Sequence, residues 1–221
     1  MKNIILILLS IVLLSCKKDD NFPRTEIISS GSKWNIQIGS SASDVYKQIQ
    51  QLGTEKHFSY LAIVGQGPFS KPEDLQSRLP FYDAITLSTS TGVIQRAVIA
   101  FKADQVSSIE VGGALPVETD KWPQDAPGNT AIQKGDALTV LYSKLLTIHQ
   151  LPSFADYQLV LPDKTLSKAL DPNMLNYTQW AFTFALNVRP GRSGTSAVVL
   201  YFKDGKLEKI RHDYNESDVY N

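Results

Sequence analysis

The sequence predicts a mixed α+β fold of two tandem repeats, each a helix, with a short second helix, packed on an antiparallel β-meander. Two ordered matches predict the repeat: residues 36–49 align without gaps on residues 132–145, and residues 98–104 resemble residues 199–205. Alternating apolar residues late in each half predict strands with one buried face. An apolar sheet face needs a cover, which the amphipathic helix supplies.

The aligned segments predict the opening helix of each repeat. Apolar residues recur there at i, i+4 and i+7, which is the spacing of one helix face. Gly39 and Gly135 each precede a small polar cluster that can cap and start a helix. His57 and His149 follow these helices, so we expect both at helix C-termini.

The remaining elements follow in the same order in both halves. Ser70 to Glu73 has the pattern of a capping box and opens the short helix of the first half. The expected strands are 58–64, 81–89, 93–102 and 105–111, then 154–161, 177–189, 195–203 and 206–214, with a short helix near 163–170. Asp204-Gly205 is a strong hairpin signal, and Trp180 lies on the predicted buried face.

The first residues form a secretory signal. Lys2 precedes an apolar run too short to span a bilayer, and Leu13-Leu14-Ser15-Cys16 resembles the lipobox of bacterial lipoproteins. The resemblance implies fatty acylation of Cys16, including palmitate-like chains, with cleavage before it; a plain cleaved signal peptide is the alternative. The expected domains are 1–15 signal peptide, 16–32 lipidated Cys and flexible tether, 33–121 first repeat, 122–130 linker and 131–216 second repeat.

The residues after Cys16 bear on location. Lys17 is not the Asp that retains such lipoproteins in the inner membrane, so the resemblance implies a lipid-anchored outer-membrane protein. Residues 16–20 also resemble a surface-export signal of some Gram-negative lipoproteins, which leaves both the periplasmic and the cell-surface side open. The membrane, through the lipid on Cys16, is thus an expected partner.

Charge and composition narrow the function classes. Lys plus Arg and Asp plus Glu are both 22, so no strong basic field favours nucleic acid as a partner. Cys16 is the single cysteine, and His57, His149 and His212 are scattered, so no metal site or cofactor is predicted. Gly191 to Gly194 resembles a nucleophile elbow only faintly. We therefore expect no catalytic residues and no enzyme activity.

Four residues are candidates for binding. Trp122 lies in the Pro-rich join and is the best candidate for an exposed aromatic platform. Gln179, Arg189 and Tyr201 are expected on the outward face of the second sheet, a natural contact surface. A solvated sheet face with no partner is the alternative for these three residues.

Lys33 to Tyr214 resembles, in order of elements, the tandem modules of beta-lactamase inhibitor proteins and of small outer-membrane assembly lipoproteins. In the inhibitors, two helix-plus-sheet units grip a protein. The resemblance implies a non-enzymatic binding module for an envelope or secreted protein, and matches no contact residue. The alternatives are a glycan-binding accessory lipoprotein, which needs exposed aromatics, and a hydrolase, which needs a histidine beside a carboxylate.

Overall fold

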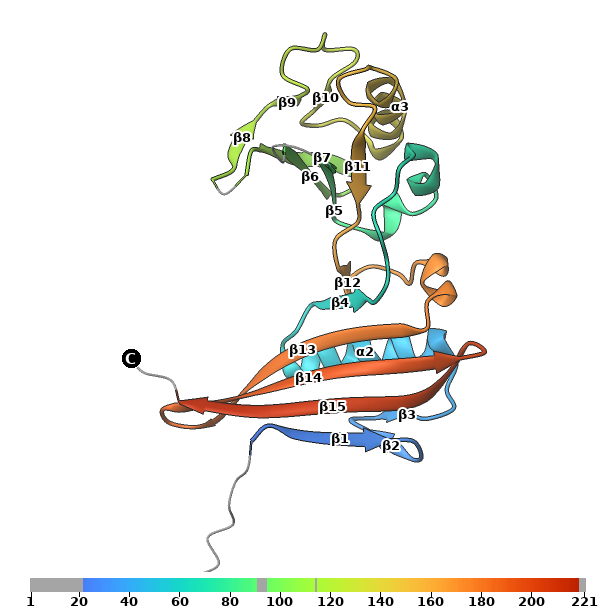
Figure 1. Cartoon of the computed structure of the whole chain (residues 1–221), viewed down its shortest axis with the longest axis vertical. Coiled ribbons are helices and arrows are strands. Elements are labelled where there is room, and N and C mark those ends of the chain that lie inside the picture. Colours follow the sequence, from blue (N-terminus) through green and yellow to red (C-terminus); the bar gives the residue numbers. More distant parts are fainter. Residues whose placement is uncertain (1–21, 91–94, 114, 219–221) are drawn as a thin grey trace, which may run out of the picture.

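A computed structural model of the protein describes residues 22–90, 95–113 and 115–218. In these residues the fold is mixed α+β, with two α-helices and antiparallel sheets arranged in two lobes (Figure 1). The predicted fold class is confirmed at that level. Within the same ranges no helix is both long and apolar enough to cross a membrane.

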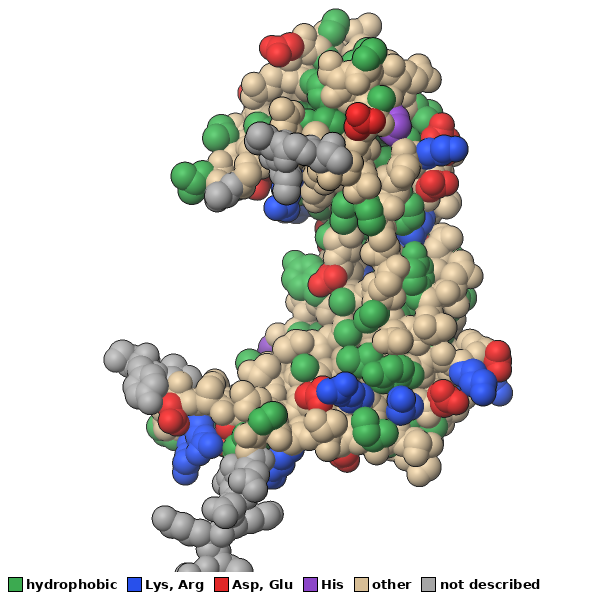
Figure 2. Space-filling view, in the orientation of Figure 1, with side chains coloured by type: hydrophobic (Ala, Val, Ile, Leu, Met, Phe, Trp, Pro, Cys, Tyr) green, Lys and Arg blue, Asp and Glu red, His purple; other side chains and the backbone are tan. Residues whose placement is uncertain are grey.

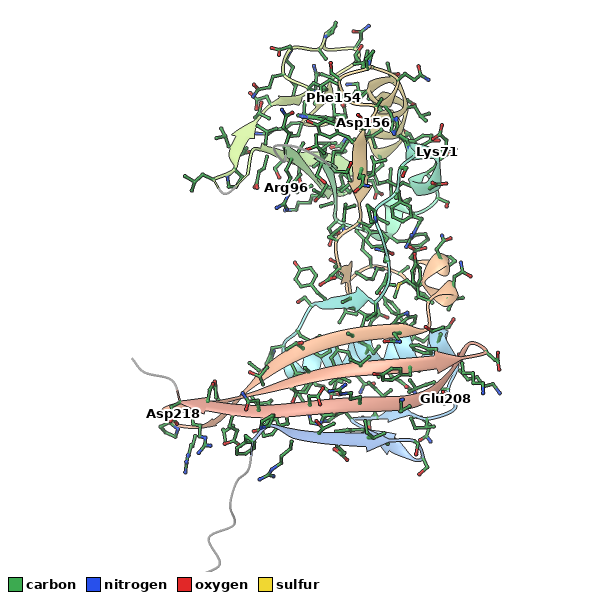
Figure 3. The ribbon with its side chains drawn as sticks, viewed as in Figure 1. Lys71, Arg96, Phe154, Asp156, Glu208 and Asp218 are labelled. Carbon is green, nitrogen blue, oxygen red and sulfur yellow. The ribbon has the colours of Figure 1, made fainter. Side chains whose placement is uncertain are left out.

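The terminal lobe, residues 22–64 and 164–218, holds a six-stranded sheet of order β1-β15-β14-β13-β4-β12, with helix α2 (Ala42–Lys56) behind it in Figure 1. Glu208 and Asp218 lie toward the two ends of its longest strand (Figure 3). The strands are β1 (Arg24–Ile28), β4 (Tyr60–Ile63), β12 (Lys164–Thr165), β13 (Gln179–Arg189), β14 (Arg192–Lys203) and β15 (Lys206–Asp218). A hairpin of β2 (Ser32–Lys33) and β3 (Ile36–Gln37) precedes α2, and a 3-10 helix, η3 (Pro172–Asn176), precedes β13.

The insert lobe, residues 65–163, holds a five-stranded sheet of order β11-β5-β6-β7-β8 and helix α3 (Leu138–His149). Its strands are β5 (Ala84–Thr89), β6 (Arg96–Lys102), β7 (Gln105–Val111), β8 (Val117–Thr119) and β11 (Tyr157–Val160). The 3-10 helices η1 (Pro72–Leu75) and η2 (Leu79–Phe81) and the short pair β9 (Lys121–Trp122) and β10 (Ile132–Gln133) complete it.

Each helix packs against strands from the other half of the sequence. Helix α2 contacts β13 and β15 at the end of the chain, and α3 contacts β7. The strand that follows each helix joins the same sheet that the helix packs on: β4 follows α2 and pairs with β13, and β11 follows α3 and pairs with β5. The expected packing of each helix on the meander of its own segment, 33–121 or 131–216, is therefore corrected. Each helix packs with the later strands of the other half of the sequence instead.

The two helices start from the same backbone geometry. The Gly39 N–H donates to the Leu207 carbonyl over 2.8 Å. The Gly135 N–H likewise donates to the Val106 carbonyl over 2.8 Å. Both glycines have φ of 87°, a left-handed conformation that glycine adopts at little cost. Each helix N-terminus is thus bonded to the last hairpin of the opposite half.

The cores follow the strand alternation. Trp180, Phe182 and Phe184 are buried, as predicted for one face of β13, and Trp180 packs against Tyr46 of α2. The buried face ends before the strand does, because Val188 is 42 % exposed. Helix α2 covers the sheet with a regular apolar face consisting of Val45, Tyr46, Ile49 and Leu52.

Four local predictions need correction. The expected tether contains β1, which pairs with β15 along residues 24–28, so the fold begins earlier than Lys33. No helix lies near 163–170, where the chain instead forms β12, and the short helix comes at 172–176. The linker 122–130 starts within β9, which pairs with β10. The capping box at Ser70 does not form, because η1 begins after Lys71 without a side-chain cap.

Candidate functional site

The candidates from the sequence do not converge. Cys16 lies outside the described residues. Gln179 and Tyr201 face each other in the register of β13 and β14, and the Lys209 amine lies 4.2 Å from the Tyr201 ring centroid. Arg189 ends β13 at the hairpin and is exposed. Gln179 and Tyr201 therefore share a half-exposed patch, and Arg189 lies at the far end of the strand.

Trp122 is not an exposed platform. Its side chain is only 7 % exposed, and its ring packs at 5.2 Å from Phe154 and 5.7 Å from Tyr157. These rings form one wall of a hollow of about 350 Å³ whose polar lining includes Arg96 and Asp125. Figure 3 labels Phe154 and Arg96 in the insert lobe. The expectation of an exposed Trp122 is wrong, because its ring closes the core below this hollow.

The three histidines lie in separate places. His57 is the left-handed C-cap of α2, and His149 is the last residue of α3, as the sequence predicted. The His149 Nε2 atom lies 2.7 Å from the Ser70 carbonyl oxygen. No group of three or more His, Cys, Asp or Glu side chains in the described ranges could hold a metal ion.

His212 forms an arrangement that resembles a nucleophile site. Its Nε2 atom lies 3.0 Å from the Ser196 hydroxyl, and its Nδ1 atom lies 3.7 Å from a carboxylate oxygen of Glu26. Burial, and then the charge of Lys33, lower the pKa of His212, while Glu26 opposes this shift. The imidazole is thus mainly neutral at pH 7.

Two features of this trio argue against catalysis. Ser196 is 1 % exposed, so substrate has no access to its hydroxyl. Ser196 also lies in the middle of β14, with β13 paired on one side and β15 on the other. The backbone N–H groups around it are therefore used in the sheet, and none is left to form an oxyanion hole. We interpret Ser196 and His212 as buried polar groups that satisfy each other, with the exposed Glu26 at their edge.

The junction of the two lobes holds a more distinctive cluster. Arg78 of the insert lobe and Asp171 of the terminal lobe form a buried ion pair with Nε and Oδ2 2.7 Å apart. The Tyr82 hydroxyl donates to the same carboxylate oxygen over 3.1 Å, and an Arg78 Nη2 donates to Gln66 Oε1 over 2.6 Å. Such a paired and hydrogen-bonded arrangement fixes the geometry of the groups that form it. The two lobes are therefore held in one relative position.

Two lysines complete this junction. Lys164 is fully buried, and its amine donates to the Thr165 carbonyl over 2.8 Å. The amine also lies 5.6 Å and 5.9 Å from the ring centroids of Tyr46 and Tyr82. Burial lowers the pKa of Lys164 to about 8. Lys168 donates to the Tyr82 carbonyl across the junction over 2.8 Å.

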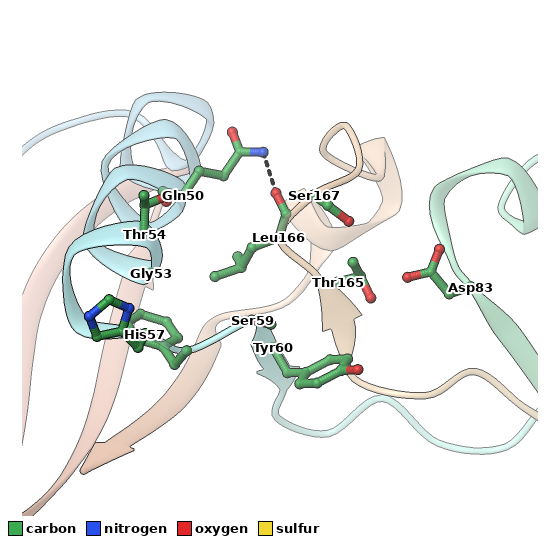
Figure 4. Close-up of a pocket in the computed structure, with 11 residues that line it drawn as sticks. Gln50, Gly53, Thr54, His57, Ser59, Tyr60, Asp83, Thr165, Leu166 and Ser167 are labelled. Atoms are coloured by element: carbon green, nitrogen blue, oxygen red, sulfur yellow. Dashed lines mark hydrogen bonds between the residues drawn. The ribbon is translucent and has the colours of Figure 1, made fainter. Parts of the chain in front are cut away.

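Two hollows open beside this junction, on the two sides of the segment His57–Tyr60. The larger, of about 670 Å³, lies between the end of α2 and β12, with Asp83 of the insert lobe in its lining (Figure 4). One wall is fixed by Gln50, whose amide donates to the Leu166 carbonyl over 2.6 Å. The smaller, of about 460 Å³, is lined by Asp163 and the start of β13. Figure 2 shows the molecule hollowed between its two lobes.

Tyr60 separates the hollows and is 61 % exposed, which is unusual for a large ring. The sequence carried a partial signal for it, because strand alternation places Tyr60 opposite the buried Leu61 and Ile63. Asp163 and Lys164 gave no such signal, since adjacent charged residues after a proline resemble an ordinary loop. The sequence analysis named none of these three residues, nor Arg78 and Asp171 of the buried pair.

The hollows at this junction present an aromatic ring, hydroxyls, a histidine and carboxylates, which can contact and hydrogen-bond another molecule. No protein-family model, no curated protein and no solved structure matches the chain.

Proposed function

We propose that the protein is a lipid-anchored envelope lipoprotein that acts as a non-enzymatic protein-binding module, with its binding site at the junction of the lobes. The main observation in favour of this site is the pair of hollows on either side of the exposed Tyr60. The buried Arg78–Asp171 pair supports the proposal, because a rigid concave surface loses little entropy when a partner docks.

Site-specific photo-crosslinking tests the site. A photoreactive amino acid replaces Tyr60 in the full-length protein, and the matched control places it at Tyr201 on the outer sheet face. We expect one recurrent envelope protein to be captured from position 60 and not from position 201. Capture from position 201 alone would move the site to the patch of Gln179 and Tyr201. If neither position captures a protein, although both variants fold correctly, the binding-module proposal is rejected.

The anchor is a separate part of the proposal. We propose that Cys16 carries the acyl chains and holds the protein at the outer membrane, on its periplasmic or cell-surface side. Because β1 begins at Arg24, the chain between Cys16 and the sheet can reach at most roughly 30 Å, so the terminal lobe stays near the membrane. Cys16→Ala should abolish fatty-acid labelling and release the protein from the membrane fraction. Unchanged labelling would reject acylation of this thiol.

Glycan binding is the second candidate, and the hollow beside Trp122, Phe154 and Tyr157 favours it. The half-buried Phe154 ring, next to Arg96 and Asp125, offers a stacking surface and hydrogen-bonding groups to a sugar, with the buried Trp122 and Tyr157 rings beside it. Titration with envelope polysaccharides should then change tryptophan fluorescence, and Phe154→Ala should weaken the response. A flat titration with every polysaccharide would leave protein binding as the better proposal.

We also propose that the chain arose by duplication of one helix-and-strands unit. Equivalent bonds support this origin: the Ala42 N–H donates to the Gly205 carbonyl, and the Leu138 N–H donates to the Asp104 carbonyl. A bulge also interrupts both hairpins one step before Phe101 and Phe202. Reciprocal exchange of helices between two copies would produce this arrangement in one chain.

A further inference from the structure

Strand β13 has one edge that is open over most of its length. On one side it pairs with β14 from Gln179 to Arg189. On the other side β4 pairs with it at Trp180 and Ala181 only. Beyond Ala181, no strand in the described ranges pairs with this edge. In Figure 1 the open part faces the space between the two lobes.

The backbone groups that point out of this edge can be identified. The Val64 N–H donates to the Gln179 carbonyl over 3.0 Å, so the odd-numbered residues of β13 direct their backbone groups to the β4 side. Thr183, Ala185 and Asn187 therefore present N–H and C=O groups outward, and all three residues are exposed. Such a row of groups is a template for another strand.

The equivalent edge of the insert lobe is closed. There β11 pairs with β5 from Thr86 to Thr89, and Phe69 bonds the outer side of Leu159 through both N–H and C=O. In the terminal lobe the segment before β4 does not continue along the edge of β13. Phe58 of that segment instead stacks on Phe182, with ring centroids 4.8 Å apart. The stretch Thr183–Val188 also lacks the charges and prolines that usually protect an edge.

The smaller hollow at the junction lies alongside this open edge. Ala181 and Thr183 of β13 line it together with Tyr60 and Asp163. Asp163 is the only carboxylate in this lining, is exposed, and has no ion-pair partner among the described residues. A side chain that enters the hollow from an added strand would thus meet one negative charge beside an aromatic ring.

We propose that this edge of β13 binds an extended peptide segment of a partner protein as an added strand, with a Lys or Arg side chain of that segment directed at Asp163. The proposal rests on the protein-binding function above and names its mode and the chemistry of the partner. The position of the edge, beneath the insert lobe in Figure 1, favours a single extended segment over a second folded copy. Backbone bonds at three residues supply affinity, and the hollow supplies specificity.

Synthetic strand-forming peptides of alternating Thr and Val test this proposal, with a central Lys in one and a central Glu in the other. Binding to the full-length protein in detergent is followed by fluorescence anisotropy. We expect the Lys peptide to bind about fivefold more tightly than the Glu peptide, as one solvent-accessible ion pair allows. Asp163→Lys should reverse this preference. Equal binding of the two peptides would reject the role of Asp163.

Ala185→Pro tests strand addition itself. Proline removes one outward N–H and leaves the bonds to β14 intact, since those belong to even-numbered residues. We expect it to abolish binding of both peptides, while the matched Ala185→Val retains it. Unchanged binding to Ala185→Pro would overturn the proposal, and so would a concentration-dependent dimer that this variant abolishes, because the occupant would then be a second copy.

Amide hydrogen exchange on the unmodified protein gives an independent answer if the proline variant folds poorly. The Lys peptide should protect Thr183, Ala185 and Asn187, and leave Phe184 and Leu186 unchanged because β14 already protects them. Failure of every peptide to protect these amides would overturn strand addition. The crosslinking at Tyr60 would still decide separately whether the junction binds a protein.

Discussion

Replacing the buried Lys164 with methionine should raise the free energy of unfolding at neutral pH. It should also remove the rise of that free energy with pH in mildly alkaline solution. The amine has no exposed surface, and burial lowers its pKa from 10.5 to about 8. At 1.36 kcal/mol per pKa unit, the charged form is disfavoured by roughly 3 kcal/mol in the folded state. Methionine has a similar length and no charge, so it removes this penalty.

The substitution also removes one hydrogen bond. The Lys164 amine donates to the Thr165 carbonyl, and its loss costs about 1 kcal/mol. That carbonyl keeps the Lys168 backbone N–H as a donor over 3.3 Å, so it is not left unpaired. The expected net gain for Lys164→Met is therefore roughly 2 kcal/mol at pH 7.

The pH dependence gives the sharper signature. Between pH 8 and pH 10 the unfolded state binds more protons at Lys164 than the folded state does, so the free energy of unfolding rises with pH. The rise from pH 7 to pH 9.5 should be roughly 2 kcal/mol. Above pH 10 the trend reverses, because burial raises the pKa of Tyr46 to about 12 and that of Tyr82 further.

Urea unfolding followed by circular dichroism at pH 7 and pH 9.5 measures both effects. Lys47→Met is the matched control, because its side chain is 75 % exposed and should change neither the stability nor the slope. A wild-type protein with no rise between these pH values would refute the reasoning. So would a Lys164→Met variant that keeps the same rise.

Three further changes have expected outcomes. Asp171→Ala should cost about 3–5 kcal/mol in urea unfolding, because it leaves Arg78 buried without its carboxylate; a loss below 1 kcal/mol would mean that water replaces the pair. Gly53→Ala should cost about 1–3 kcal/mol, since a Cβ there would lie 2.7 Å from the Phe58 carbonyl oxygen; an unchanged melting temperature would show that this turn yields easily. Ser196→Ala should cost about 1 kcal/mol and leave labelling by a serine-directed fluorophosphonate at background, whereas strong wild-type labelling lost in the variant would reveal a nucleophile.

Local elements were largely predictable from the sequence. The strands around Trp180 and Leu200 follow from alternation, and the turn at Asp204-Gly205 follows from the left-handed conformations that both residues adopt. Helix α2 follows from its apolar spacing and from Ser41, which accepts a hydrogen bond from the Asp44 N–H. These are signals that neighbouring residues carry by themselves.

The arrangement of the halves and the junction were not predictable. Helical periodicity identifies the apolar face of a helix but not the sheet that this face packs against. The packing of α2 on β13 and β15 was therefore not predictable from it. The stretch before Lys33 is polar, and only pairing with β15 makes it a strand. The burial of Lys164 was also not predictable, because its amine lies against Tyr46 and Tyr82, which come from distant parts of the sequence.

The packing of α2 on the last strands of the chain has a consequence for folding. In a chain that crosses a membrane amino-terminus first, α2 emerges long before β13 and β15, which cover its apolar face. The insert lobe is contiguous and its partners arrive together, so it can assemble while the rest is still in transit. The apolar side of α2 stays uncovered until the last residues arrive, and a chaperone that shields it would act during that interval.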